Sequence, residues 1–303
     1  MNFLKAYNTA VMDSIDNTKI LFILNAGAGS KGTDWQAEIE KYFAELSHTI
    51  EVLTLDDNCS MEPVHEKIAS FLPTLVVAAG GDGTVKLVAE CASEKDIPLG
   101  ILPGGSANGL AKELGIPLEP QEALHILTTG KIKKIHLIKV NEHLCIHLSD
   151  IGFNAYVIKK FDAQAGRGMW GYLKASVKVL FQHAKMEVDI QIDGQNKTVN
   201  AAMIVIANGN SYGSGALINP IGKLDDNLFE VVAVKKVSLR ELFKMVVTHK
   251  PYDPKKIAIY QTDNLKMKSA KKAHFQVDGE YLGKTNNIKA VLLPGALEIV
   301  VPH

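Results

Sequence analysis

Three glycine-rich turns, each placed after a run of apolar residues, hold the residue types best suited to chemistry. They read NAGAGSKG (25–32), GGDGT (80–84) and LPGGSANG (102–109). Glycine lets the backbone approach a phosphate closely, and the positive end of a following helix attracts the same anion. These turns therefore predict phosphate binding, and three of them suit a triphosphate better than a single phosphate.

The first turn leaves two other interpretations open. Gly27, Gly29 and Gly32 form G-x-G-x-x-G, and Asp56 lies near the end of the next apolar run. That arrangement is also typical of dinucleotide-binding folds. A tight turn that needs glycine for purely structural reasons is the second alternative.

The second turn contains a carboxylate where phosphate binding would disfavour one. Asp82 would repel a phosphate unless a cation lay between them. Mg²⁺ is suited to that place, because proteins bind it through one or two carboxylates together with substrate phosphates. We expect Asp82 to hold Mg²⁺ and Thr84 to cap the following helix, the alternative being an Asp that only caps a turn.

A second chemical group lies far along the chain, in FQVDGEYLG (275–283). Asp278 and Glu280 are two residues apart, which puts both carboxylates on one face if a strand continues through Gly279. A carboxylate that accepts a hydroxyl proton is the general base of phosphoryl transfer. Taken alone, the same three residues indicate a hairpin turn.

The elements that must position these residues change character near residue 131. Before it, short apolar strands (19–24, 50–55, 74–79 and 98–103) alternate with helical segments (34–46, 61–71, 85–93 and one that ends at Gly130). After it, strands and turn signals follow one another, among them one expected strand at 144–153, with one helical stretch at 169–185. We predict an α/β domain at 1–133 with a parallel, Rossmann-like sheet, and a mostly antiparallel β-sandwich at 134–303 whose C-terminal tail packs back on the first domain.

Composition excludes several classes of protein. The 303 residues contain 33 Lys plus Arg and 33 Asp plus Glu, so no overall field favours nucleic acid. Three separated cysteines without paired spacing argue against a disulfide framework and a zinc site. The longest uncharged window is broken by Asn, Ser, Pro and Gly, which a membrane span does not tolerate, and the N-terminus does not read as a signal peptide. We expect a cytoplasmic protein.

In this order over nearly the whole chain, NAGAGSKG, GGDGT, LPGGSANGLAKELGIP, LDDNLFEVV and VDGE resemble the catalytic unit of diacylglycerol kinases, sphingosine kinases and their soluble bacterial relatives. GGDGT is shared with NAD kinases. The resemblance implies an ATP- and Mg²⁺-dependent lipid kinase with its active site in a cleft between two domains. It also implies a lipid alcohol as substrate and peripheral contact with the inner face of the membrane.

Position by position, the resemblance assigns roles to particular residues. Asp278 would be the general base, with Glu280 and Asp82 as further catalytic residues. The nucleotide would contact Asn25, Gly27, Gly29, Thr54, Gly80, Gly81, Asp82, Gly83, Thr84, Gly105, Ser106 and Asn108. Asp226 and the backbone carbonyls of Lys223 and Leu228 would hold a structural Mg²⁺. The chain departs from the family at Ala26, Ala28, Gly109 and Asn227, where relatives usually have Pro, Ser, Asp and Gly.

Membrane contact has its own sequence signal. Arg167, Lys174, Lys178 and Lys185 fall on one helical face beside Trp170 and Phe181, which indicates either an interfacial helix or a solvated one. Two other functions stay open: phosphorylation of a soluble acceptor such as NAD, and a non-catalytic nucleotide or lipid sensor. The sequence does not identify the lipid, and it leaves the oligomeric state open, a homodimer included.

Overall fold

The computed structural model describes residues 18–25, 33–56, 60–162, 185–210, 217–248 and 250–303. The chain divides into two compact units, Met1–Lys134 together with Leu297–His303, and Ile135–Ala296. The helix expected at 169–185 lies outside the described residues except for Lys185. No helix in the described part of the chain is both long and apolar enough to cross a membrane.

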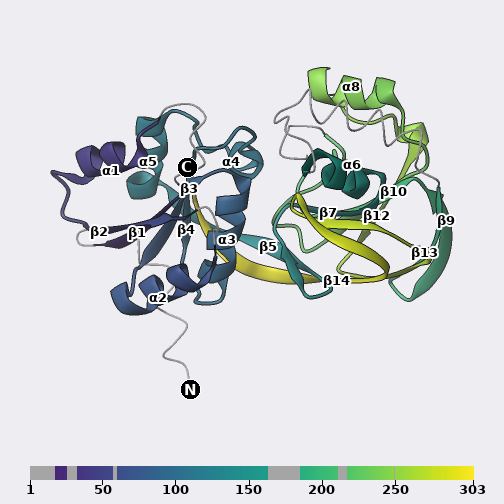
Figure 1. Ribbon diagram of the computed structural model, residues 1–303, viewed down its shortest axis with the longest axis horizontal. Coiled ribbons are helices and arrows are strands. Elements are labelled where there is room, and N and C mark those ends of the chain that lie inside the picture. Colours follow the sequence, from purple (N-terminus) through teal and green to yellow (C-terminus); the bar gives the residue numbers. More distant parts are fainter. Residues whose placement is uncertain (1–17, 26–32, 57–59, 163–184, 211–216, 249) are drawn as a thin grey trace. The chain divides into compact units, whose positions relative to one another are not determined.

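The first unit is an α/β domain with a parallel sheet (Figure 1). Its elements are β1 (Lys19–Asn25), α1 (Trp35–Phe43), β2 (Thr49–Leu55), α2 (Glu62–Phe71), β3 (Leu75–Gly80), α3 (Asp82–Ser93), β4 (Leu99–Pro103), α4 (Gly109–Glu113) and α5 (Pro120–Thr129). The strands lie in the order β4-β3-β1-β2, all parallel. The end of a later strand, β14 (Glu280–Val301), pairs in parallel with β4 through Ile299 and Leu99.

Burial explains why the strands of this unit are continuous apolar runs. Every residue of β3 is buried, because α1 and α5 cover one face of the sheet and α2 and α3 cover the other (Figure 1). On the α1 and α5 side, Val77, Leu124 and Val300 belong to one core. The chain enters α1 at Asp34, whose carboxylate accepts the N–H of Ala37 and so caps the helix.

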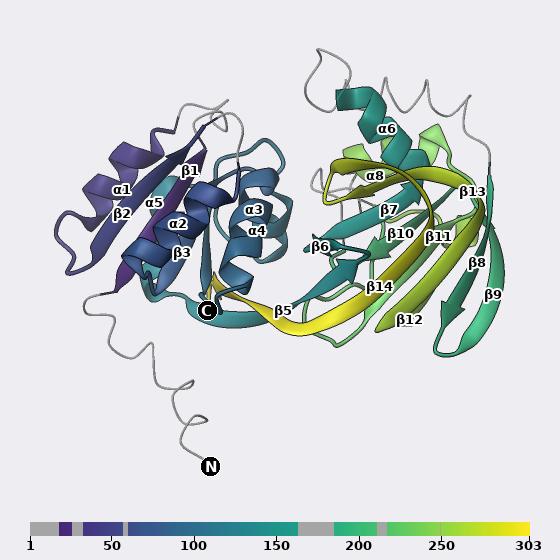
Figure 2. The same ribbon diagram turned by 60° about the horizontal axis from the view of Figure 1, so that its bottom comes forward.

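The second unit is mostly antiparallel (Figure 2). It and the strands leading into it comprise β5 (Lys131–Val140), β6 (His143–Cys145), β7 (Leu148–Gly152), α6 (Phe153–Asp162), β8 (Met186–Ile192), β9 (Gln195–Ala201), β10 (Met203–Ala207), β11 (Phe229–Val234), α8 (Leu239–Thr248), a short 3-10 turn (Pro254–Lys256), β12 (Ile257–Thr262), β13 (Asn264–Val277) and β14. The strands run β12-β11-β10-β7-β13-β14, and β8 pairs with both β13 and β9.

Two cores lie on opposite sides of the central strands of this unit. Ile204 of β10 belongs to a core between strands, which also contains Phe275. Its neighbour Val205 belongs to a second core, which contains Phe153 of α6 and Met245 of α8. Because successive side chains of a strand point to opposite faces, β10 is apolar throughout rather than alternating. The unit is therefore sandwich-like.

One sequence expectation is wrong at this level. The apolar stretch 144–153, expected to be one strand, contributes to β6, β7 and the first residue of α6. Of the two alternatives left open at Gly279, the continuous strand does not form: β13 ends at Val277, and β14 begins at Glu280 as its direct cross-strand partner. Asp278 and Gly279 are thus the two turn residues of a hairpin, and the one-face arrangement of Asp278 and Glu280 does not form.

Candidate active site

In the first unit, the structure brings the described parts of the three glycine-rich turns together at the ends of β1, β3 and β4. The side-chain amide of Asn25 donates to Oγ1 of Thr84 at 3.2 Å, which links the first turn to the second. The N–H of Gly104 donates to the carbonyl of Gly80 at 2.8 Å, which links the second to the third. Gly27 and Gly29 lie outside the described residues.

Close backbone contact explains why glycine is needed where the second and third turns meet. A Cβ on Gly105 would lie 2.5 Å from the Cα of Gly81, and one on Gly80 would lie 2.5 Å from Oγ1 of Thr84. The Cα of Gly81 is a backbone atom, so it cannot rotate away from a Cβ on Gly105 as a flexible side chain could. In contrast, a Cβ on Gly83 would meet no atom of the described residues within 4 Å. As far as the described residues show, a ligand has room beside Gly83.

Helix α3 begins earlier than the sequence suggests. It starts at Asp82, and Gly81 is the N-cap, so Thr84 lies inside the first turn and is not the cap. Thr84 is buried, and its hydroxyl instead accepts the hydrogen bond from Asn25. The prediction of a Thr84 cap was wrong because α3 begins two residues before Thr84, and its N-cap, Gly81, has no side chain. The N–H groups of the first helical turn follow directly after the glycines.

Asp82 is fixed through one of its two oxygen atoms. The N–H of Gly109, at the start of α4, donates to Oδ1 of Asp82 at 2.7 Å. Among the described residues, Oδ2 makes no hydrogen bond. A carboxylate held on one oxygen, with the other available beside exposed backbone N–H groups, fits the donor set of Mg²⁺ bound together with phosphates. The contact uses only the backbone N–H of Gly109, so it does not depend on the residue type at this departure from the family.

The other predicted nucleotide residues lie around this edge. Asn108 folds back on its own turn, accepting from the N–H of Gly105 at 2.8 Å and donating to the Gly105 carbonyl at 2.9 Å. Ser106 is exposed. Thr54 is exposed near the end of β2, opposite Leu24 in the parallel register, and makes no hydrogen bond with the described residues of the glycine turns.

In the second unit, Asp278 lies in a two-residue hairpin turn. Its φ is 48° and that of Gly279 is 89°. A turn with both central residues in the left-handed region matches the twist of the flanking strands, and Asp-Gly is a preferred pair for it. The hairpin interpretation of this motif is therefore confirmed, and it does not compete with a chemical role, because the turn presents the carboxylate.

That carboxylate is held by a row of backbone donors. Oδ1 accepts from the N–H groups of His147 at 2.9 Å and Leu148 at 3.0 Å, and Oδ2 accepts from Ile146 at 2.9 Å. The Cys145 thiol lies 3.7 Å from Oδ1. In return, the N–H of Asp278 donates to the Leu148 carbonyl at 2.8 Å. A carboxylate has about four lone-pair positions, so Oδ2 retains one for a further donor.

Helix α6 packs over the same hairpin. The ring of Tyr156 on α6 stacks on His274 of β13, with centroids 4.3 Å apart and planes within 5°. The Nδ1 atom of His274 lies 2.7 Å from the hydroxyl of Tyr281 on β14. Glu280 begins β14 and is exposed. Both strands of the hairpin are thus connected to the helix that covers them.

The predicted structural metal site lies in the turn before β11. Oδ1 of Asp226 is 3.4 Å from the N–H of Leu228, and Lys223 is exposed. Asn227 has a φ of 63°, a conformation that Gly adopts freely and Asn tolerates, which accounts for Asn in place of the usual Gly. Nearby, burial raises the pKa of the Glu230 carboxyl, which accepts hydrogen bonds from Asn219 and Gln261.

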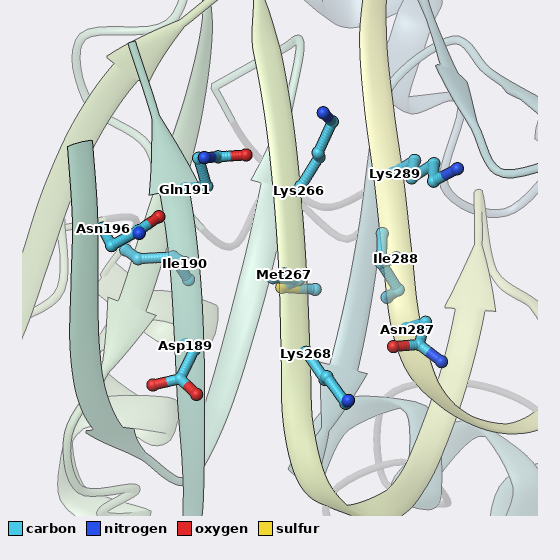
Figure 3. Close-up of a pocket in the computed structure, with 10 residues that line it drawn as sticks. All are labelled: Asp189, Ile190, Gln191, Asn196, Lys266, Met267, Lys268, Asn287, Ile288 and Lys289. Atoms are coloured by element: carbon cyan, nitrogen blue, oxygen red, sulfur yellow. The ribbon is translucent and has the colours of Figure 1, made fainter. Parts of the chain in front are cut away.

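A shallow hollow of about 310 Å³ lies elsewhere on the second unit (Figure 3). It lies over β8, β13 and β14, and three of its lining residues are Lys266, Lys268 and Lys289. Figure 3 shows these three lysines pointing away from one another. The side chains therefore do not converge on a common ligand, and Lys268 is ten residues along β13 and the turn from Asp278.

Sequence reasoning missed the partners of Asp278. Sequence patterns do not identify the backbone N–H groups of residues 146–148 as partners of Asp278. These residues lie about 130 positions from it in the chain, and any residue type except proline supplies a backbone N–H. Two buried polar side chains, Asp150 and Gln276, were also missed; Gln276 donates to Asp150 and accepts from the N–H of Gly279. One signal was available: Ser-Asp interrupts the apolar stretch 144–153, and a buried carboxylate needs partners.

Comparison with known proteins agrees with this architecture. Residues 19–140 match the model of the diacylglycerol kinase catalytic domain, and residues 149–301 match the model of the YegS C-terminal NAD kinase beta sandwich-like domain. A protein of Pseudomonas aeruginosa named "Probable lipid kinase YegS-like" is 30% identical over 72% of this chain and 72% of its own length.

Two further comparisons extend the likeness. An "Uncharacterized protein" of Synechocystis is 28% identical over 76% of this chain, which spans 55% of that longer protein. A crystal structure of a diacylglycerol kinase from Bacillus anthracis superposes with a TM-score of 0.71 at 22% identity, covering 94% of this chain and 97% of the other. At that identity, the superposition establishes the fold.

Proposed function

Since the chain belongs to the family of diacylglycerol kinases and YegS-like lipid kinases, we propose that it transfers the γ-phosphoryl group of ATP to the hydroxyl of a lipid alcohol. The observation that carries the proposal is the Asp278 carboxylate, held by three backbone N–H groups with one lone pair of Oδ2 left for a hydroxyl donor.

The nucleotide end of the reaction is assigned to the first unit. The phosphates of ATP lie against the glycine turns, where the N–H groups of the first turn of α3 face the anion. Oδ2 of Asp82 would hold Mg²⁺, which would supply neutralisation of the phosphate charge. Asn25 and Thr84 hold the first and second turns together. A second Mg²⁺, of structural character, is proposed at Asp226 with the carbonyls of Lys223 and Leu228.

The acceptor end is assigned to Asp278. Its Oδ2 accepts the hydroxyl proton of the lipid as the oxygen attacks the γ-phosphorus, and the bond from that phosphorus to the β,γ-bridging oxygen breaks to release ADP. Direct transfer requires Asp278 and the phosphates to face the same substrate. Glu280, two residues further, is proposed to assist at the acceptor.

Substrate access follows from the substrate class. A lipid alcohol stays in its bilayer, so the proposal includes peripheral contact at the inner face of the membrane. The basic residues of 167–185, which lie outside the described residues except for Lys185, are the proposed membrane contact. Reversing the charge of Lys174 and Lys178 should then weaken co-sedimentation with anionic vesicles, and unchanged co-sedimentation would contradict this part of the proposal.

A soluble acceptor is the second candidate, and one observation favours it. The second unit matches a model described as NAD kinase beta sandwich-like. A non-catalytic sensor is the third. One assay separates them: labelled ATP and Mg²⁺ are incubated with the protein and either mixed-lipid vesicles or NAD, using Asp278→Asn as the matched control. Label in a lipid, lost in the variant, supports the proposal. Label in NAD or in neither acceptor would overturn it.

A further inference from the structure

A chain of buried hydrogen bonds connects the first turn of α6 to the Asp278 hairpin. Asp150 is 0% exposed, Asn154 is 3% and Gln276 is 1%. Oδ1 of Asp150 accepts from the N–H of Ala155 at 2.8 Å, and Oδ2 accepts from the side-chain amide of Asn154 at 2.6 Å. Gln276 then donates to the same Oδ2 at 2.5 Å. Asp150 thus joins the helix to β13.

The chain continues into the turn itself. Oε1 of Gln276 accepts from the N–H of Gly279 at 2.7 Å. The backbone carbonyl of Gln276 in turn accepts from the hydroxyl of Ser149, the neighbour of Asp150. Gly279 directly follows Asp278, and the side chain of Gln276 is the hydrogen-bond acceptor for its N–H at the edge of the turn. The position of the turn therefore depends on which way the Gln276 amide faces.

A carboxylate decides that orientation. An ionised carboxylate only accepts hydrogen bonds, whereas a side-chain amide has one accepting end and one donating end. Asp150 therefore requires the NH₂ group of Gln276, which leaves the carbonyl of the same amide for Gly279. We propose that Asp150 and Gln276 are positioning residues that hold the Asp278–Gly279 turn in the geometry in which Asp278 receives the hydroxyl proton. This inference rests on the function proposed above, and it concerns residues that touch neither nucleotide nor acceptor in that scheme.

Two single substitutions break the chain in opposite ways. Asp150→Asn places a donor opposite the NH₂ of Gln276; if the glutamine amide turns to meet it, a second donor then faces Gly279. Gln276→Glu keeps an acceptor for Gly279 but puts two carboxylates at hydrogen-bonding distance. Each is expected to lower kcat about 10- to 100-fold, the scale of misplacing a catalytic group, while the KM for ATP stays within about twofold.

The double substitution Asp150→Asn with Gln276→Glu restores the donor and acceptor order. The new amide at position 150 donates to the new carboxylate at position 276, which accepts from Gly279 as before, and the Asn154 amide turns to present its oxygen. We expect kcat to recover to within about threefold of the wild type. Recovery in the double variant is a result that general loss of stability does not produce.

Glu230→Gln is the matched control. Glu230 is 1% exposed in the same unit and, like Asp150, accepts from two side-chain amides, while among the described residues no hydrogen bond joins its side chain to the hairpin. Its substitution should change the thermal midpoint but not kcat per folded molecule. Amide exchange at Gly279, followed by NMR, provides a direct readout: exchange should speed up in Asp150→Asn, where the acceptor is lost, and slow again in the double variant.

The outcomes separate the two claims. An active Asp278→Asn variant, or a wild type without kinase activity, overturns the proposed function. If Asp278→Asn is inactive but both single variants keep wild-type kcat, the general base stands and the positioning inference is wrong. A loss in the single variants without recovery in the double variant also overturns the inference. An equal loss of kcat in Glu230→Gln would do so as well.

Discussion

The N–H of Gly109 donates to Oδ1 of Asp82 across 2.7 Å, so the start of α4 fixes the carboxylate at the start of α3. The two oxygens of the Asp82 carboxylate therefore have different roles. Oδ1 accepts the hydrogen bond that stabilises the fold, and Oδ2 is the ligand of the proposed Mg²⁺. Substitution can remove them one at a time.

Asp82→Asn keeps an oxygen for Gly109 but removes the charge. We expect stability within about 0.5 kcal/mol of the wild type and kcat lower by at least about 100-fold, because the proposed metal loses its carboxylate. Asp82→Ala should lose a further 1 kcal/mol or so of stability, since it also removes the acceptor for Gly109. Chemical denaturation and initial rates over a Mg²⁺ series measure the two effects. Normal turnover in Asp82→Asn would exclude Asp82 as the metal ligand.

Two glycine substitutions in the same region should separate an effect on stability from an effect on ATP binding. Gly105→Ala forces a methyl group against the Cα of Gly81, and we expect it to destabilise the protein by about 1–3 kcal/mol. Gly83→Ala has open space and lies in α3, so stability should rise by up to about 1 kcal/mol. Its methyl group would nevertheless obstruct the proposed phosphate, raising the KM for ATP about tenfold. Unchanged ATP affinity in Gly83→Ala would mean that phosphate binds elsewhere.

The hydrogen bond between Asn25 and Thr84 should couple the first two turns. Asn25→Ala and Thr84→Val each remove one partner, and the double variant removes both. We expect a coupling free energy of about 1 kcal/mol in a double-mutant cycle of unfolding. The KM for ATP should rise several-fold in each variant. Additive effects within error would show that the contact contributes nothing.

Stability at low pH should depend on Glu241 of α8. Hydrogen bonds from the ammonium groups of Lys244 and Lys256 lower the pKa of Glu241 to about 2, from an ordinary value of 4.5. A lowered pKa in the folded state adds stability that is complete above the unfolded value and is lost as the pH falls from 4.5 toward 2. Thermal midpoints should therefore fall less steeply with acid in Glu241→Gln than in the wild type.

Comparing the wild type with Glu241→Gln separates the pH dependence due to Glu241 from that due to Glu230, which has the opposite sign. Burial raises the pKa of Glu230 above its value in the unfolded chain. The stability that Glu230 contributes is therefore complete below the unfolded pKa and is lost as the pH rises through the folded pKa. Both proteins retain Glu230, and subtracting one pH profile from the other cancels it. Parallel profiles for the wild type and Glu241→Gln would refute the assigned role of the two lysines.

The sequence predicts this fold well where a residue pattern is compatible with only one kind of structural element. Continuous apolar runs such as 74–79 indicate buried parallel strands, and glycines after them indicate the ligand edge. Helix α6 was missed because the apolar stretch 144–153 suits a strand as well as the approach to a helix. The Thr84 cap failed for a related reason, since helix starts are defined by backbone geometry and not only by capping residues.

The site is predictable only in part, because its long-range partners leave no local pattern. The Asp-Gly pair at 278–279 predicts the hairpin, and the resemblance adds the chemical role. Neither reveals that the N–H groups of 146–148 hold the carboxylate, or that Asp150 faces Gln276. Those relations arise from strand pairing between β7 and β13, which periodicity in one segment does not encode.

The pairing of Ile299 with Leu99 has a consequence for how the chain is made. Residues 297–303 belong to the first unit but are synthesised after all of Ile135–Ala296. A fragment that ends at Lys134 leaves the outer edge of β4 unpaired and omits Val300 from the core, and an unpaired edge invites pairing with other chains. Gel filtration of that fragment, with and without a peptide of residues 297–303, should show self-association relieved by the peptide. During translation, the first unit would emerge first and yet be completed last.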